Sequence, residues 1–371
     1  MTRNEMDAID EMQRKQGMAC ENLLAGSAWN RAQTITKAGL MQRLTMIPAA
    51  GLPRMRVLSQ STLKRLGRIP RSHESYQEDA YQAVRRCGDG EFNRPKAVIL
   101  FYTHRWKRPN WCEELQKELP WESDERQQAM KEGKIFGDPD DASHSKARSL
   151  IAYGDWFKQR QVWLGREGVH GHTGMVTRDR GLEIFWWVDW ACTDQNALGP
   201  DMAALPAYAA ACAGAVAAWS PDYASRAWCQ VELLMAYAFM QTGSVVFVVP
   251  EGFAGAKPQG TRGDKWVKEE EVVLADPAKG NLTNDNDRPV IQSLTGVAKR
   301  STAYSCWRVF VKHSTQSVDH FCFWNVCCCC GWCGIKACDD SRKVHPGDSI
   351  VRKLLPVGET LAAPSQQAMQ R

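Results

Sequence analysis

From Lys96 to about Arg300, the chain alternates short apolar runs with amphipathic segments. The apolar runs are continuous, which is typical of strands that are covered on both faces, as in a parallel sheet. They predict five strands: AVILFYT (97–103), EIFWWVD (183–189), GAVAAWS (214–220), SVVFVVP (244–250) and EVVLA (271–275).

Amphipathic segments between the apolar runs predict helices. The four clearest are residues 144–159, 201–213, 225–242 and 288–300. Strands that alternate with helices indicate an α/β domain with right-handed crossovers. We assign this domain to residues 96–300.

Four segments flank or interrupt this alternation. Residues 1–90 have the pattern of polar helices and linkers, and predict a helical extension ahead of the domain. Residues 107–141 are charged and predict an added helix, whereas the Gly- and Lys-rich residues 251–270 predict a mobile loop. After about Thr302 the alternation stops, so an irregular tail is expected over residues 301–371.

The composition, with 44% hydrophobic and 24% charged residues, is ordinary for a globular protein. The net charge of +5 is diffuse, although residues 54–71 are locally basic. That stretch suits a solvated helical arm better than contact with nucleic acid or an anionic membrane, because no known nucleic-acid-binding module accompanies it. We therefore expect no nucleic-acid partner.

The N-terminal segment lacks the apolar core of a secretory signal. The longest uncharged stretch, Met202–Trp219, has about the length of a membrane span, but Pro206 and Gly214 interrupt it. A short helix followed by a buried strand explains this stretch better. These features predict a cytoplasmic protein.

Polar and aromatic residues follow three of the predicted strands. The first strand ends at Thr103 and is followed by His104, Arg105 and Trp106, while the second ends at Asp189. The third is followed by a Pro-Asp turn and a helix start. In an open parallel sheet, ligands bind outside the carboxyl ends of the strands. We therefore expect these groups to converge on one edge of the sheet.

Glu232 is the strongest functional candidate, because it is a carboxylate among apolar helical neighbours and its desolvation is costly. Trp228 precedes it by four residues, so the two are expected to share a helix face. Ser225 is expected to cap the helix by accepting from a backbone N–H. The alternative interpretation is a structural carboxylate paired with Arg105 or Arg226.

The segment after the first strand supplies a cation and an aromatic plate. Arg105 and Trp106 suit a phosphate or a nucleobase, or form a surface arginine stacked on tryptophan. Asp189 closes its strand, where a carboxylate binds ribose hydroxyls or caps the next segment. Both interpretations stay open for each group.

Three motifs carry a resemblance to a known family. SPDYASRAWCQVEL (220–233) resembles the plant pattern of the TIR (Toll/interleukin-1 receptor) domain, with its Tyr-Ala-Ser turn and Trp-Cys-x-x-Glu-Leu. AVILFYTHRW is similar to a divergent TIR-like group whose first strand ends in Ser-His-Arg-Trp, with Thr103 here in place of the Ser. FWWVDWACTDQ resembles the second-strand motif of the same group. The resemblance covers residues 96–300.

This resemblance implies a flavodoxin-like, five-stranded parallel sheet, self-association and, in many members, cleavage of NAD to nicotinamide and ADP-ribose or its cyclic forms. The family's catalytic glutamate falls on Glu232. The matching motif positions Thr103, Ser225, Trp228 and Cys229, together with His104 and Asp189, are then expected to line the site. Arg105 would meet the pyrophosphate, and Trp106 or Trp228 would stack on a ring. NAD is a substrate in this interpretation, and no cofactor or metal is expected.

The chain departs from the plant pattern in two places. His104, Arg105 and Trp106 replace the Gly and acidic residues that plant members carry after the first strand, and the insertion at 107–141 lies beside the expected mouth. Three hypotheses therefore stand: an NAD-cleaving TIR-like enzyme, a non-catalytic TIR-like scaffold, and a nucleoside deoxyribosyltransferase-like enzyme that shares the sheet type and a nucleophilic glutamate.

The tail is rich in cysteine. Seven of the 14 cysteines fall between Cys322 and Cys338. A zinc site from Cys330, Cys333, Cys338 and His345 is one interpretation, and acylation that anchors the tail to a membrane is another. The third is a tail of no assignable role. Membrane contact is expected only through such acylation.

Overall fold

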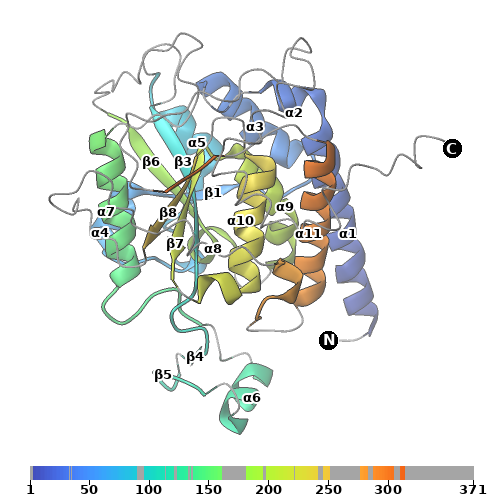
Figure 1. Cartoon of the computed structure of the whole chain (residues 1–371), viewed down its shortest axis with the longest axis vertical. Coiled ribbons are helices and arrows are strands. Elements are labelled where there is room, and N and C mark those ends of the chain that lie inside the picture. Colours follow the sequence, from blue (N-terminus) through green and yellow to red (C-terminus); the bar gives the residue numbers. More distant parts are fainter. Residues whose placement is uncertain are drawn as a thin grey trace.

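A computed structural model of the chain gives the arrangement of its elements (Figure 1). The structure describes residues 3–32, 34, 36–89, 96–112, 114–120, 123–132, 134, 137–160, 181–194, 198–220, 222–240, 245–250, 276–282, 287–304 and 310–313.

A seven-stranded sheet forms the centre of the molecule, with the strand order β2-β1-β6-β3-β7-β8-β9. Neighbouring strands from β6 to β9 are all parallel, whereas β1 pairs antiparallel with both β6 and β2. The strands are β1 (Arg56–Ser59), β2 (Glu78–Asp79), β3 (Ala97–His104), β6 (Glu183–Val188), β7 (Gly214–Trp219), β8 (Val245–Pro250) and β9 (Phe310–His313).

Helices cover both faces of the sheet (Figure 1). On one face lie α4 (Gln60–Leu66) and α7 (Ser145–Arg160), which contact each other. On the other face α9 contacts α1, α3 and α10, and α10 contacts α11. The elements of that face are α1 (Arg3–Ala25), α3 (Lys37–Ala49), α9 (Leu198–Ala211), α10 (Ala227–Phe239) and α11 (Arg288–Tyr304).

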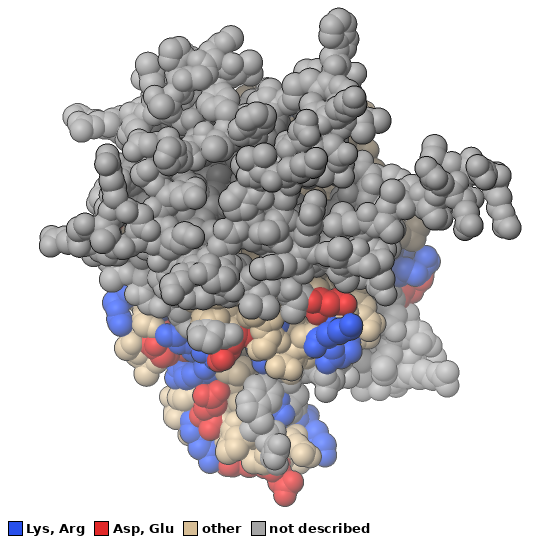
Figure 2. Space-filling view, viewed as in Figure 1, with Lys and Arg blue, Asp and Glu red and all other residues tan. Residues whose placement is uncertain are grey.

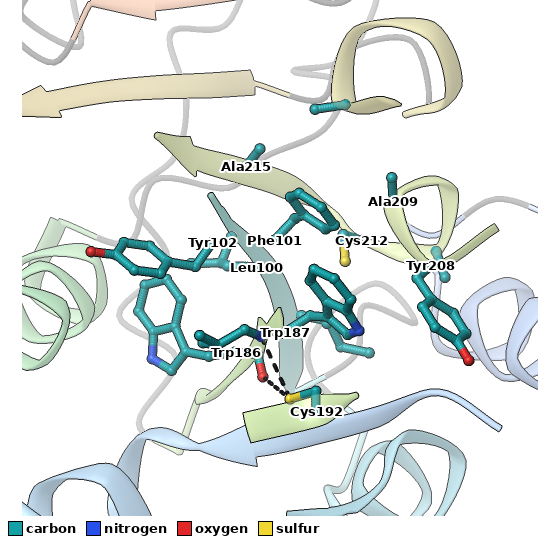
Figure 3. Close-up of a cluster of buried hydrophobic side chains, with 14 of the residues drawn as sticks. Leu100, Phe101, Tyr102, Trp186, Trp187, Cys192, Tyr208, Ala209, Cys212 and Ala215 are labelled. Carbon is teal, nitrogen blue, oxygen red and sulfur yellow. Dashed lines mark hydrogen bonds between the residues drawn. The ribbon is translucent and has the colours of Figure 1, made fainter. Parts of the chain in front are cut away.

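The continuous apolar runs form the central strands because both of their faces are buried. Every residue of β3 and of β7 is buried. Between the sheet and α9, the Phe101 and Trp187 rings stack with centroids 4.6 Å apart, and Tyr208 of α9 packs against Trp187 (Figure 3). Burial of aromatic side chains this large makes a major contribution to stability.

Four predicted strands are confirmed as β3, β6, β7 and β8, and the four predicted helices as α7, α9, α10 and α11, with ends shifted by a few residues. The predicted strand 271–275 lies outside the described residues, and β9 pairs with β8. The expectation of a purely parallel sheet was wrong, since β1 joins it antiparallel. Asp189 does not close β6 but begins α8 (Asp189–Cys192).

Residues 1–90 are mainly helical, as predicted, but they belong to the central core. They contribute β1 and β2 to the sheet, together with α2 (Ser27–Arg31), α5 (Ala80–Arg86) and the 3-10 turn η1 (Ser72–Glu74). Val57 and Leu58 of β1 and Ile47 of α3 are fully buried in the same cluster as the central strands. The expectation of an extension without strands was wrong, because these strands are too short to give a recognisable pattern.

The insertion at 107–141 contains the predicted helix, α6 (Asp124–Lys131), and a hairpin of β4 (Trp111–Cys112) and β5 (Lys117–Glu118). It has a small core of Cys112, Leu119 and Ala129, and it projects away from the sheet (Figure 1). Basic and acidic side chains are interspersed on its surface (Figure 2). The predicted loop 251–270 and, apart from the end of α11 and β9, the tail 301–371 lie outside the described residues.

Within the described part of the chain, none of the helices combines the length and apolar character needed to cross a membrane. The uncharged stretch 202–219 is divided between α9 and β7, as the sequence predicts.

Candidate active site

The carboxyl ends of β3, β6 and β7 meet at one edge of the sheet, because β3 pairs in parallel with both neighbours. β3 ends with Thr103 and His104, α8 follows β6, and the turn after β7 leads through the 3-10 helix η3 (Tyr223–Ser225) into α10. This edge therefore collects the three polar clusters that the sequence predicts there.

Glu232 lies on α10 and is only 5% exposed. Burial, and then the negative charge of Asp189, raise the pKa of Glu232 well above its usual value, and a hydrogen bond with the Thr103 hydroxyl opposes this only in part. Among the described residues, no basic side chain forms an ion pair with Glu232. Arg105, one of the two partners that the sequence suggested, pairs with Asp222 at 3.3 Å. These surroundings therefore favour the neutral form of Glu232.

A chain of hydroxyl groups lies beside Glu232. Tyr223 Oη donates to the carbonyl oxygen of Cys229 over 3.1 Å and lies 2.7 Å from Thr103 Oγ1. The Thr103 hydroxyl, which also bonds Glu232, thus links the carboxyl group to Tyr223. The side chains of Thr103, Tyr223 and Glu232 are all buried. Each hydrogen bond therefore avoids the free-energy cost of a buried polar group without a partner.

Asp189, the first residue of α8, is the second carboxyl group of the site. Oδ1 accepts from His104 Nε2 at 3.2 Å and from the Trp190 backbone N–H at 2.6 Å, and Oδ2 accepts from Trp106 Nε1 at 2.9 Å. Burial acts to raise the pKa of Asp189, but its interactions with His104, and then with Trp106 and the Trp190 N–H, outweigh burial and hold the pKa below its usual value. Asp189 is therefore the ionised carboxylate of the pair.

The His104 ring is enclosed, with only 1% of its side chain exposed. It stacks on Tyr102 at a centroid distance of 4.9 Å, and its Nδ1 lies 3.2 Å from Nζ of Lys146 on α7. Lys146 is itself 1% exposed. The ring thus connects a buried cation on one side with the Asp189 carboxylate on the other.

The rim of the site is more open than its floor. The Asp189 side chain keeps 21% of its surface exposed and that of Arg105 keeps 27%. Trp106 packs edge-on against Trp190, and Arg71 lies over the Trp190 ring at 5.1 Å. The side chains of the rim are therefore partly exposed, while Glu232 lies deeper.

Two predicted residues act in other ways. Ser225 does not cap α10: its hydroxyl donates to the Asp222 carbonyl within η3, and the cap residue is Arg226, without a side-chain hydrogen bond. The Trp228 indole N–H donates to Asp287 at 2.9 Å, just ahead of α11. Neither hydrogen bond reaches the carboxyl pair.

Cys229 joins α10 to β3, because its thiol donates to the His104 carbonyl at 3.4 Å. Burial is the main cause that raises the pKa of Cys229, so that it stays a thiol. The structure thus brings Thr103, His104, Trp106, Asp189, Cys229 and Glu232 together, with Arg105 at the rim.

Sequence reasoning missed Lys146 and the hydroxyl of Tyr223. The signal for Tyr223 was its place in the turn after the third strand, whereas a single Lys at a helix start gives no signal of burial. Among the described residues, no three His, Cys, Asp or Glu side chains are placed to hold a metal ion. The zinc ligands suggested for the tail lie outside the described residues.

Comparison of the chain with family models, with curated proteins and with solved structures found no match. The functional argument therefore depends on the chemistry of this edge of the sheet.

Proposed function

We propose that the chain is a TIR-like signalling domain that cleaves the nicotinamide–ribose bond of NAD. The observation that carries the proposal is the pair of neighbouring carboxyl groups, Glu232 with a raised pKa and Asp189 with a lowered pKa, at the carboxyl edge of a largely parallel sheet. Carboxyl groups whose pKa values are shifted apart by their surroundings are typical of catalytic sites.

The topology supports a flavodoxin-like assignment. Numbered along the chain, the five parallel strands lie in the order 2-1-3-4-5, which is the flavodoxin order, and β1 adds an antiparallel strand at one side. In that fold, ligands bind at the point where the strand order reverses, between the first and third strands. Those strands are β3 and β7 here, and Glu232 follows β7 and contacts Thr103 at the end of β3.

The carboxyl pair suits a cationic substrate. The nicotinamide ring of NAD is positively charged, and a cation beside Glu232 lowers the pKa of this residue and releases its proton. As the bond to ribose breaks, nicotinamide leaves as a neutral molecule and positive charge develops on the ribose, which the two carboxylates stabilise. Water then adds to the ribose to give ADP-ribose and a proton, or a hydroxyl group of the same molecule closes a ring.

The rim offers groups for the rest of the substrate. Arg105 is the cation that would bind the pyrophosphate, after exchange of its exposed partner Asp222, whose side chain is 63% exposed. Trp106 is the aromatic group of the rim and is fixed by Asp189. Trp228 is the alternative group for stacking, and its indole N–H is engaged by Asp287.

The near-complete burial of Glu232 favours one alternative, a non-catalytic TIR-like scaffold that acts through homotypic self-association. In that case the carboxyl pair only fixes α8 and α10 against β3. Incubation of the purified full-length chain with NAD, over a range of protein concentrations, separates the two functions. Release of nicotinamide supports the enzyme, whereas concentration-dependent assembly without release supports the scaffold. Base exchange on deoxynucleosides without NAD cleavage would point instead to a deoxyribosyltransferase.

Glu183→Gln is the matched control for substitutions of Glu232. Glu183 begins β6 at the opposite end of the sheet and pairs with Lys158 of α7 at 3.2 Å. The proposal expects this variant to release nicotinamide at the wild-type rate. Loss of activity in the control would mean that general destabilisation, rather than the site, accounts for the effect of Glu232 substitutions.

A further inference from the structure

Lys146 is a buried cation to which the reaction described above gives no role. It lies in the first turn of α7, is 1% exposed, and donates from Nζ to His104 Nδ1 over 3.2 Å. Burial of a lysine is costly unless its ammonium group is paired or hydrogen-bonded. The hydrogen bond to the His104 ring, which itself binds Asp189, offsets part of this cost.

The start of α7 is fixed by two neighbouring carboxylates. Asp140 accepts from the backbone N–H groups of Lys146 and Ala147, each at 2.8 Å, and Asp141 accepts from the N–H of Ser145 at 3.1 Å. Carboxylates that satisfy the first N–H groups of a helix stabilise its start. These hydrogen bonds fix the backbone of Lys146, and its side chain contacts His104.

The base of the insertion reinforces this helix start. Lys107 Nζ donates to Asp141 at 2.9 Å and to Ser145 Oγ at 2.6 Å. The backbones of Arg108 and Asp138 form an antiparallel bridge across the two ends of the insertion. The insertion therefore closes on itself beside β3 and leads directly into the helix that carries Lys146.

The donors and acceptors around His104 select one tautomer of its ring, the one with the hydrogen on Nε2. An ammonium group only donates, so Nδ1 opposite Lys146 must present its lone pair. The ionised Asp189 only accepts, so Nε2 must carry the hydrogen. Nδ1 also lies 3.4 Å from the Arg105 carbonyl oxygen, which is the acceptor that the opposite tautomer would use. Lys146 disfavours that tautomer.

We infer that Lys146 is a positioning residue of the Glu232 site, which acts through His104 to orient the Asp189 carboxylate. This inference rests on the proposed cleavage of NAD. In the absence of Lys146, the ring can place its hydrogen on Nδ1 and turn a lone pair toward Asp189. Asp189 then loses the His104 N–H, which holds its carboxylate together with the Trp106 and Trp190 N–H groups.

Several charged or titratable groups surround this arrangement. The Cys229 thiol on α10 lies within the electrostatic reach of Glu232, Arg226, Lys146 and Asp189. Asp140, from the base of the insertion, contacts the backbone of Lys146, and Tyr223 lies on the far side of Thr103. Lys146 contacts His104, and His104 contacts Asp189, whose charge affects the pKa of Glu232. A substitution of Lys146 is therefore expected to change the pKa of Glu232 through Asp189.

The first test reads the His104 ring in the full-length protein by ¹⁵N NMR of labelled histidine. The chain has 8 histidines, so a His104→Gln variant is used to assign the signals of His104. The wild type is expected to show one neutral tautomer with its hydrogen on Nε2. A hydrogen on Nδ1, or a doubly protonated ring, would overturn the inference without any need for a variant at Lys146.

The second test compares Lys146→Met with Lys158→Met, which removes a lysine of the same helix that pairs with Glu183. Lys146→Met is expected to mix the His104 tautomers, to slow nicotinamide release about 10- to 100-fold, and to shift its pH profile. Lys158→Met is expected to change none of these. A folded Lys146→Met protein with the wild-type ring signals and pH profile would overturn the inference.

The two hypotheses fail in different ways. If the wild type releases no nicotinamide, the proposed function fails, and the role of Lys146 in that reaction fails with it, whatever the ring shows. If the wild type is active but its His104 carries the hydrogen on Nδ1, the proposed function stands and only the inference about Lys146 fails.

Discussion

Glu232 and Asp189 lie close enough at the carboxyl edge of the sheet for the charge of Asp189 to raise the pKa of Glu232. The same surroundings lower the pKa of Asp189, because His104, Trp106 and the Trp190 backbone donate to it. The surroundings of the two neighbouring carboxyl groups thus shift their pKa values in opposite directions. This arrangement favours the proton on Glu232 and the negative charge on Asp189.

The first prediction concerns the pH dependence of stability. The unfolded chain loses the Glu232 proton near pH 4.5, the ordinary value for a glutamate, whereas the folded chain keeps it to a higher pH. Above about pH 4.5 the folded state therefore binds more protons, so Glu232 makes the free energy of unfolding fall as pH rises, by up to about 1.4 kcal/mol per pH unit. This fall continues until the folded-state pKa is reached.

Glu232→Gln removes this titration and keeps the shape of the neutral acid. Relative to the wild type, the variant is expected to gain stability in urea denaturation as the pH rises above about 5, until the folded-state pKa of Glu232 is passed. A stability difference that does not change with pH over this interval would show that Glu232 is ionised in the folded protein.

The second prediction concerns Asp189→Asn. An amide has one acceptor oxygen in place of two, so the N–H of either His104 or Trp106 is left without its acceptor, at a cost of about 1–3 kcal/mol. The pKa of Glu232 is expected to fall in this variant but to stay above 4.5, because burial is the larger cause of its shift. ¹³C NMR of labelled glutamate measures this pKa, and an unchanged value would refute the influence of Asp189.

Much of this site follows from the sequence, because the carboxyl ends of parallel strands share one edge. Thr103, His104 and Asp189 could be assigned to that edge from strand ends, and Glu232 from its place in the helix that follows the third of these strands. Lys146 could not, because the insertion separates it from β3 in sequence and only the closed base of the insertion brings it back.

Local conformation explains the remaining differences. Ser225 looks like a helix cap in sequence, but a 3-10 turn ends at this residue and α10 begins two residues later. Trp228 shares a helix with Glu232, yet its indole N–H is taken by Asp287 ahead of α11, a partner that the helical spacing does not reveal. The strands β1 and β2 contain only four and two residues, too few for a hydrophobic period to be recognised.

The third prediction concerns the hydroxyl chain. Thr103→Val removes the group between Glu232 and Tyr223, whereas Thr103→Ser retains it and loses only a methyl group. Val is expected to lower the free energy of unfolding by about 1–3 kcal/mol, and Ser by about 1 kcal/mol. Combining Thr103→Val with Tyr223→Phe is expected to cost less than the sum of the two single changes, because their hydroxyls bond each other at 2.7 Å. If the losses in free energy of unfolding are additive in urea denaturation, the hydrogen bond between Thr103 and Tyr223 is contradicted.

The fourth prediction concerns the base of the insertion. Gly137 has a φ of +65°, and an added Cβ would lie 2.7 Å from the Trp106 ring. Gly67 has the same φ with nothing within 4 Å of its Cβ position, so Gly67→Ala is a control for backbone strain alone. Gly137→Ala is expected to be the more destabilising of the two and to shift the Trp106 indole N–H signal in NMR. Equal stabilities and an unmoved signal would show that Trp106 is not packed on Gly137.

The central claim, that the carboxyl group of Glu232 takes part in NAD cleavage, is tested most directly by the rate of nicotinamide release at equal concentrations of folded wild-type and Glu232→Gln protein. Since the variant keeps the size of the side chain and cannot become an anion, the account predicts a loss of at least about 100-fold. Release by the variant at the wild-type rate, or no release by the wild type at any protein concentration, would contradict it.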